Sequence, residues 1–136
     1  MTHWATQYIG REWVNREHDC WAFTRLIQRN HFNCDLPHID IDAGDVSACV
    51  RALISHPEHE RWVAIDYPIE GDVLLMSQNK QPTHVGVWLD VDGGGVLHCI
   101  ERGGVIFTKR RDLYHIGYNA VQFYRHQSSM VMDMQC

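Results

Sequence analysis

The stretch that decides the fold is HVGVWLDVDGGGVLHCI, residues 84–100. Apolar residues alternate with other residues before and after a loop that contains three consecutive glycines. Such alternation is typical of strands with one buried face, and a glycine-containing loop between two of them is typical of a β-hairpin. We therefore expect strands over residues 84–90 and 96–101, paired antiparallel through the loop at 91–95.

The parity of this hairpin determines which side chains meet. If its loop is Val91 to Gly93, then Gly86 lies opposite His98, and His98 lies diagonal to His84 on the same face. A loop of even length would move His98 to the opposite face. Gly86 has no side chain, so it leaves the face uncrowded beside His84, as the close approach of a helix end would require. We expect the two histidine rings to lie side by side.

The rest of the chain divides into a helical half and a strand half. Turn residues and alternation predict three more strands, at 72–76, 105–109 and 118–125, with a loop at 78–82. The first half gives helical signals instead: a short helix capped by Thr2 that ends at Gly10, a helix from Cys20 to about Asn30, a helix from Asp42 to Ile54, and a turn or short helix at 57–64. This order predicts an α+β fold, in which N-terminal helices pack on an antiparallel sheet. We expect a single domain over residues 1–126 and a disordered tail at 127–136.

Cys20 is placed by this pattern in the first turn of a helix. Asp19 is a suitable N-cap residue, and Phe23 and Ile27 lie four residues apart on a core-facing side. In a first turn, unpaired backbone N–H groups and the helix dipole favour a negative charge. Such a position can lower a thiol pKa from ~8.5 into the range ~3.5–7.5. Cys20 is thus a candidate nucleophile, and the alternative is an inert thiol that faces the core.

Cys20, His84 and His98 together predict a thiol hydrolase. His84 opens its strand and is the candidate general base for the Cys20 thiol. His98 is the candidate third residue, since a neighbouring ring can hold the His84 imidazole in one tautomer. Cys99 follows directly and points to the other face, where a core role is expected. A mechanism of this kind needs no cofactor and no metal.

Composition excludes several other classes of protein. The chain carries a net charge of -5, which argues against nucleic acid as a partner. Its one basic run, residues 109–111, fits a solvated strand end. No apolar run approaches the ~20 residues that span a bilayer, and the N-terminus lacks the basic start and apolar stretch of a signal peptide. We expect synthesis in the cytoplasm and no membrane partner.

The five cysteines and ten histidines raise the question of disulfides or a metal site. An odd number of cysteines without a signal peptide argues against a disulfide framework, and no C-x-x-C pair is present. The spacings match no standard zinc site. The rival metal ligand sets are His31 with Cys34 and His38, or His56 with His59; solvated surface histidines are the favoured interpretation.

Five short motifs occur in a familiar order along the chain. They are Ile9-Gly10-Arg11-Glu12-Trp13, Asp19-Cys20-Trp21-Ala22-Phe23, Glu70-Gly71-Asp72-Val73-Leu74, His84-Val85-Gly86-Val87-Trp88 and Val96-Leu97-His98. This ordered set resembles the NlpC-type cell-wall cysteine peptidases, which have a papain-like fold reduced to its minimum. Each motif alone is common, whereas the ordered set over residues 9 to about 101 is specific.

The resemblance implies a papain-like fold and a Cys20–His84–His98 triad. It implies an endopeptidase that cuts stem peptides of peptidoglycan through a thioester. The same fold also hosts amidases and acyltransferases, so these remain alternatives for the reaction. A non-catalytic structural component of a phage tail tip is the alternative from a different class.

Two features depart from the family pattern. Members usually follow the cysteine with Ser-Gly, where this chain has Trp21-Ala22. The Asp-Cys-Trp form and the ending at 117–125 resemble the phage-tail and prophage branch, which implies other phage-tail proteins as partners and a place in a virion. Many members also carry a tyrosine near the position of Trp13, whose hydroxyl helps to bind the oxyanion. An indole offers only an N–H, so Trp13 is left out of the catalytic set.

Overall fold

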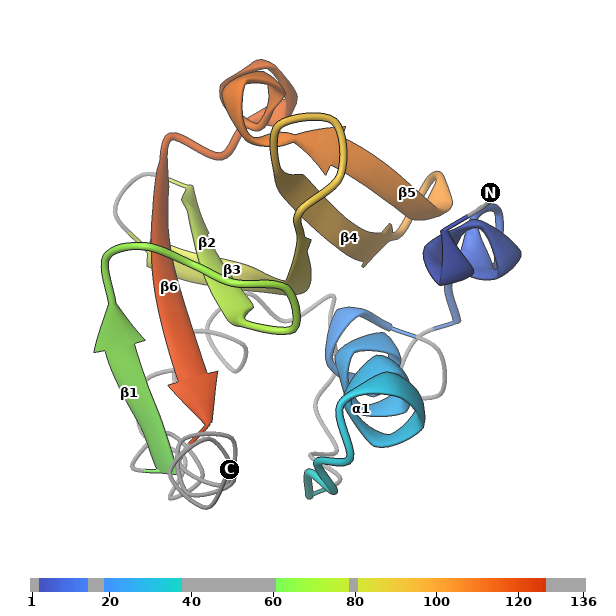
Figure 1. Cartoon of the computed structure of the whole chain (residues 1–136). Coiled ribbons are helices and arrows are strands. Elements are labelled where there is room, and N and C mark those ends of the chain that lie inside the picture. The colour runs from blue at the N-terminus through green and yellow to red at the C-terminus, as the bar shows by residue number, and fades with distance from the viewer. Residues whose placement is uncertain (1–2, 15–18, 38–60, 79–80, 127–136) are drawn as a thin grey trace.

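The computed structural model describes residues 3–14, 19–37, 61–78 and 81–126. Within these residues a six-stranded antiparallel sheet has the order β1-β6-β2-β3-β4-β5, and helix α1 packs beside it (Figure 1). The strands are β1 (Trp62–Ile65), β2 (Val73–Gln78), β3 (Gln81–Leu89), β4 (Gly95–Ile100), β5 (Gly104–Lys109) and β6 (Ala120–His126). The helical elements are η1 (Trp4–Tyr8), α1 (Cys20–His31), η3 (Arg110–Asp112) and η4 (Tyr114–Ile116). The α+β class and the papain-like arrangement expected from the sequence are confirmed.

Helix α1 begins and ends close to the predicted residues. The Asp19 side chain accepts a hydrogen bond from the backbone N–H of Ala22 at 2.9 Å, the bond made by an N-cap residue. Phe23 and Ile27 are buried on the side that faces β3 and β4. The cap and this apolar pair thus fix Cys20 as the first helical residue.

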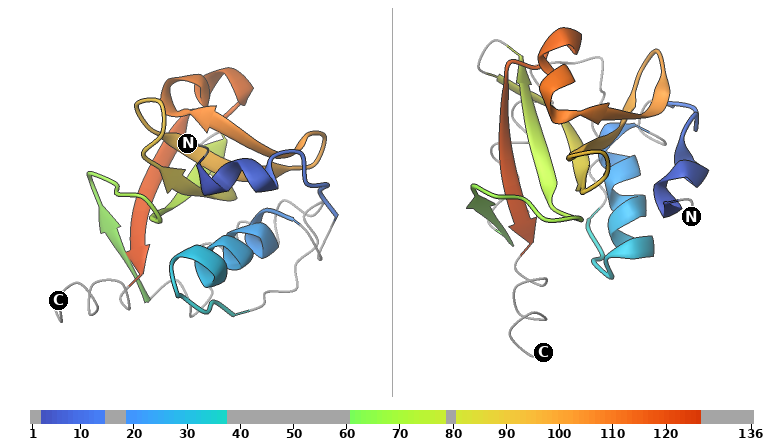
Figure 2. Two further views of the ribbon diagram at one scale, coloured as in Figure 1. Left: turned by 45° about the vertical axis from the view of Figure 1, so that its right-hand side comes forward. Right: turned by 45° about the horizontal axis from the view of Figure 1, so that its top comes forward.

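The N-terminal segment differs in detail from the prediction. The short helix η1 is a 3₁₀ helix, and its N-cap is His3, whose Nδ1 accepts from the N–H of Ala5. The predicted cap, Thr2, lies outside the described residues. Beyond η1, which lies beside α1 in Figure 2, the chain runs along the edge of β5: Gly10 N–H donates to the Val105 carbonyl and Val105 N–H donates to that of Arg11, both at 2.9 Å. These bonds cover a sheet edge that would otherwise be open.

The predicted hairpin register is confirmed. β3 pairs with β4 through Val87 opposite Leu97, Trp88 opposite Val96 and Leu89 opposite Gly95. The pairing ends at Val87 and Leu97, and just beyond it Gly86 and His98 lie side by side, since an added Cβ at Gly86 would come within 2.9 Å of the Cβ of His98. Gly94 has φ 103° and faces the Trp88 ring, where an added Cβ would come within 2.4 Å. The turn therefore needs glycine at this position both for its backbone and for space.

Other strand boundaries were predicted less well. The expected turn or short helix at 57–64 is wrong over its last residues, because β1 pairs there with β6 at the sheet edge. The expected loop at 78–82 is shorter, since β2 reaches Gln78 and β3 begins at Gln81, with a bulge that shifts the register after Met76. The helix predicted from Asp42 to Ile54 and the tail at 127–136 lie outside the described residues.

Two apolar clusters fill the two faces of the sheet. The cluster beneath α1 contains Phe23, Ile27, Val87, Leu97 and Val105. The second cluster contains Leu74, Met76, Trp88, Val96, Leu113 and Phe123. His84 and His98 alternate with Trp88 and Val96 along their strands, so they lie on the face of the second cluster. No helix in the described part of the chain is long and apolar enough to cross a membrane.

Candidate active site

His84 and His98 form the first link of a buried hydrogen-bond chain. His84 Nε2 lies 2.8 Å from His98 Nδ1, with ring centroids 5.0 Å apart. His98 Nε2 lies 2.9 Å from the hydroxyl of Thr108 on β5. Three adjacent strands thus hold one side chain each in a line. This chain leaves His84 Nδ1 as the ring nitrogen not engaged by His98.

Burial keeps both imidazoles in their neutral form. His84 is 7% exposed and His98 is fully buried. Burial, and then the neighbouring His98, hold the pKa of His84 well below its ordinary value. Burial lowers the pKa of His98 to about 4. Near neutral pH, His84 therefore has a lone pair with which it can accept a proton.

Gly86 makes the approach of His98 possible, for a reason that differs from the prediction. An added Cβ at Gly86 would lie 2.9 Å from the Cβ of His98 and 2.6 Å from Val96 Cγ2. The space beside Gly86 is therefore taken by side chains of β4, and not by a helix end as expected. A side chain at Gly86 would push His98 away from His84.

Cys20 is the first residue of α1 and is partly exposed. The other described cysteines, Cys34 and Cys99, are buried. Burial, followed by the charge of Asp19 and opposed by Arg11, raises the pKa of the Cys99 thiol to about 11. Cys99 is thus a poor nucleophile at neutral pH. Cys99 belongs to the cluster beneath α1 and so points away from the face that holds His98.

Tyr118 packs directly against His84. Its ring stacks on the His84 imidazole with centroids 5.2 Å apart and planes only 9° from parallel. Burial raises the pKa of the Tyr118 hydroxyl to about 12, and the Cys20 charge contributes in the same direction. Tyr118 thus lies against His84 and within electrostatic reach of Cys20. Its backbone N–H donates to the Leu113 carbonyl at 3.0 Å, which anchors the residue before β6 begins.

The sequence reasoning missed Thr108 and Tyr118. Thr108 fits the alternation of β5, but a threonine on a strand gives no chemical signal by itself. The sheet places it opposite Val96 and diagonal to His98. Tyr118 precedes β6 and meets His84 only because β6 pairs with β2, which in turn pairs with β3. A contact of this kind depends on long-range strand order, so no local sequence signal could have found it.

Trp13 and His31 make apolar and ring contacts in the described part of the chain. Trp13 packs against the apolar cluster beneath α1. His31 stacks on Trp4 at 3.8 Å and its Nε2 lies 2.9 Å from the Tyr8 hydroxyl. His38, His56 and His59 lie outside the described residues. Among the side chains that the structure describes, no three of the His, Cys, Asp and Glu type are grouped to hold a metal ion.

Comparisons with known proteins identify the domain. The family model of the NlpC/P60 family matches residues 6–131. The crystal structure of the NlpC/p60 domain of the peptidoglycan hydrolase SagA is similar, with 18% sequence identity and a TM-score of 0.54. The similarity covers 88% of this chain and 90% of that one, and at this identity it shows the fold. No curated protein matches the sequence. The chain belongs to the NlpC/P60 family.

Proposed function

We propose that this protein is a cysteine endopeptidase that cuts amide bonds in the stem peptides of peptidoglycan. Cys20 is the nucleophile, His84 the general base and acid, and His98 the residue that orients His84. The observation that carries this proposal is the buried His84–His98–Thr108 hydrogen-bond chain within an NlpC/P60 domain. The peptidoglycan substrate follows from the family and from the SagA similarity.

One assignment of protons makes His84 a base. If Thr108 accepts from His98 Nε2–H, then His98 Nδ1 accepts from His84 Nε2–H, and His84 Nδ1 keeps its lone pair. The reverse direction would place a proton on His84 Nδ1 and remove the base. We propose the first arrangement, in which protonation at Nδ1 also strengthens the bond from His84 to His98, because the donor is then charged.

The reaction then proceeds through a thioester. His84 Nδ1 takes the proton of the Cys20 thiol while the sulfur bonds to the scissile carbonyl carbon, whose oxygen gains the electron pair. Backbone N–H groups at the start of α1 stabilise that oxyanion. The carbon–nitrogen bond breaks, and His84 returns the proton to the leaving amine. Water, deprotonated by His84, then displaces the sulfur, which recovers the proton.

The proposal includes a finer assignment to the phage-tail branch. The Asp19-Cys20-Trp21 sequence and the residues of the last strand support it, with other tail proteins as partners and a virion as the final location. Amidase and acyltransferase chemistry on the same fold would use the same Cys20 and His84. These reactions differ in the product, so product analysis on defined stem peptides distinguishes them.

Selective alkylation of Cys20 tests the proposed nucleophile. A limiting amount of iodoacetamide at pH 7, followed by peptide mapping, compares all five cysteines in one sample. Cys20 should react fastest, while Cys34 and Cys99 should react slowly because they are buried. His84→Ala should slow the Cys20 reaction by removing its base. Equal labelling of all cysteines, together with absence of hydrolysis, would instead support a structural tail component.

A further inference from the structure

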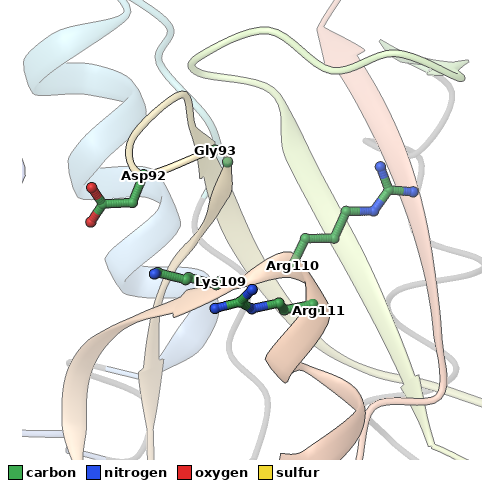
Figure 3. A pocket seen from close by; sticks show the side chains of 6 residues that line it. Asp92, Gly93, Lys109, Arg110 and Arg111 are labelled. Atoms are coloured by element: carbon green, nitrogen blue, oxygen red, sulfur yellow. The ribbon is translucent and has the colours of Figure 1, made fainter.

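A basic groove lies at the turn between β3 and β4. Its lining residues are Asp92, Gly93, Gly94, Lys109, Arg110 and Arg111, and its volume is about 580 Å³ (Figure 3). Pockets of this volume are large enough for small ligands or for a segment of a polymer. None of Cys20, His84 and His98 lines it. The groove is therefore a separate feature from the proposed catalytic site.

The charge of the groove opposes that of the whole chain. Three cations and one carboxylate line it, whereas the protein carries a net charge of -5. Within the described part of the chain, neither Lys109 nor Arg110 makes an ion pair. Arg111 lies 4.0 Å from Asp112, but both side chains are largely exposed, so this pair neutralises little. The positive charge is available to a ligand.

The cationic wall is attached to the core. The Arg110 guanidinium lies 4.9 Å above the ring of Phe123, which is buried. The Arg110 backbone N–H donates to the Gly94 carbonyl at 3.3 Å, which joins this wall to the turn. Lys109 and Arg111 point to one side and Arg110 to the other in Figure 3. The Arg110 guanidinium thus points away from the other two cations, and charges spread along the turn in this way suit an extended anion better than a single small one.

The groove begins on the strand that holds Thr108. Lys109 follows directly after Thr108, whose hydroxyl contacts His98, so the two side chains point to opposite faces of β5. Gly93 presents no side chain, and an added Cβ there would meet open space. Since β3 rises ~3.3 Å per residue from His84 to its end at Leu89, the groove lies on the order of 17 Å or more from His84, a span that an extended polymer can bridge.

We propose that this groove binds an acidic peptide segment of the substrate through its carboxylates. The inference rests on the proposed function, because it takes the ligand to be another part of the polymer that the site cuts. The guanidinium group of arginine can form bidentate hydrogen bonds with a carboxylate, and the lysine ammonium adds a further positive charge. The groove offsets the repulsion between an acidic protein and an acidic substrate, and it lowers KM without taking part in bond cleavage.

Direct binding tests the groove apart from turnover. The full chain with Cys20→Ser is titrated with a decaglutamate peptide at low salt, with decaglutamine as the uncharged comparison. Decaglutamate should bind and decaglutamine should not, and added salt should weaken the binding. The triple variant Lys109→Gln, Arg110→Gln, Arg111→Gln should bind at least about tenfold more weakly. Arg102→Gln, which removes an exposed cation from the β4–β5 turn, should bind as well as the parent.

Several results would overturn the groove proposal. These are equal binding of decaglutamate by the parent and the triple variant, equal binding of both peptides, or tighter binding of a single-stranded oligonucleotide. With active protein, the triple substitution should raise KM and leave kcat unchanged; hydrolysis with an unchanged KM would refute the groove alone. Groove binding without any hydrolysis would refute the proposed function alone.

Discussion

Two buried polar clusters on one sheet differ in how they handle charge. In the first, His84, His98 and Thr108 form a chain of neutral groups across β3, β4 and β5. In the second, Arg125 on β6 donates two hydrogen bonds of 2.9 Å to the carboxylate of Asp72, just before β2. The Asp72 carboxylate also accepts from the Ile69 N–H at 2.7 Å. Every buried side-chain nitrogen and oxygen in the described residues has a hydrogen-bond partner.

We expect the two clusters to have different roles, the histidine chain in the proposed catalysis and the ion pair in the stability of the fold. The Asp72–Arg125 pair holds two opposite charges joined by two hydrogen bonds, which tie β6 to the segment before β2. The histidine chain excludes charge, since burial lowers the pKa of both rings. His84 can accept a proton during a reaction and pass it on. We therefore expect substitutions in the first cluster to reduce turnover and substitutions in the second to reduce stability.

Replacing His84 should have the largest effect of all. His84→Ala removes both the base for Cys20 and the acid for the leaving amine, a contribution of about 10²–10⁴-fold in rate. Turnover on stem peptides should fall by this amount while circular dichroism still shows a folded protein. The melting temperature should drop, because the substitution leaves a cavity and removes the partner of His98 Nδ1. Cys20→Ser, a matched loss of the nucleophile, should be equally inactive. Full activity of Cys20→Ser would contradict the thiol mechanism.

Breaking the ion pair should instead lower stability. Asp72→Asn removes the carboxylate that pairs with Arg125, whose side chain is only 19% exposed. The free energy of unfolding should fall by about 3 kcal/mol in urea titrations. The exposed Arg111–Asp112 pair is the control, where Asp112→Asn should cost less than about 0.5 kcal/mol. Loss of turnover in folded Asp72→Asn protein, equal to that of His84→Ala, would remove the distinction between the clusters.

Lowering the pH should reduce the free energy of unfolding through the histidine cluster. In the unfolded chain, His98 has a pKa near 6.5, and burial lowers it to about 4 in the folded protein. The unfolded state therefore binds more protons between these values. The contribution of neutral His98 to the free energy of unfolding is fully present above pH 6.5. It is lost as the pH falls to 4, by on the order of 3 kcal/mol. His98→Gln should show a smaller loss of stability between pH 7 and pH 5. An equal loss of stability in the parent and in His98→Gln would contradict the lowered pKa of His98.

These clusters also show which contacts a sequence can predict. The His84–His98 contact followed from hairpin parity, because two strands joined by a short loop have a register that the loop length determines. Cys20 followed from the cap at Asp19 and the apolar stripe of α1. In both cases the decisive interactions are close in sequence.

The missed elements depend on distant pairings. β1 was missed because its strand identity comes from β6, which lies far along the chain at the same sheet edge. The Asp72–Arg125 pair likewise needs β2 and β6 to be neighbours. Tyr118 reaches His84 by the same strand order. A local pattern contains no information about which strands meet in the sheet.

His98 should contribute less to turnover than His84. The His84 ring is also held by its strand and by Tyr118, so His98→Ala should reduce kcat by roughly 10–100-fold, a loss typical of an orienting partner. His98→Asn or His98→Gln should recover part of this loss, since either amide oxygen can accept from His84 Nε2–H. Steady-state kinetics on folded variants would measure this. If His98→Ala were as inactive as His84→Ala, the base would be His98 or shared by both rings.

Substitution of Tyr118 should have the smallest effect, and it separates ring stacking from hydroxyl chemistry. The near-parallel rings indicate that Tyr118 fixes the plane of the His84 imidazole, an interaction of about 0.5–1.5 kcal/mol. Tyr118→Leu keeps apolar volume but loses the flat ring, so kcat should fall by roughly 2–13-fold at that energy, with KM unchanged. Tyr118→Phe keeps the ring and should restore kcat to within about twofold, since any hydrogen bond lost would be a weak neutral one.

Because the pKa of the Tyr118 hydroxyl is raised to about 12, that group stays protonated and can donate near Cys20. If Tyr118→Phe lost as much activity as Tyr118→Leu, the hydroxyl would be the contributing group, acting on the oxyanion in place of the tyrosine that many family members carry near the position of Trp13.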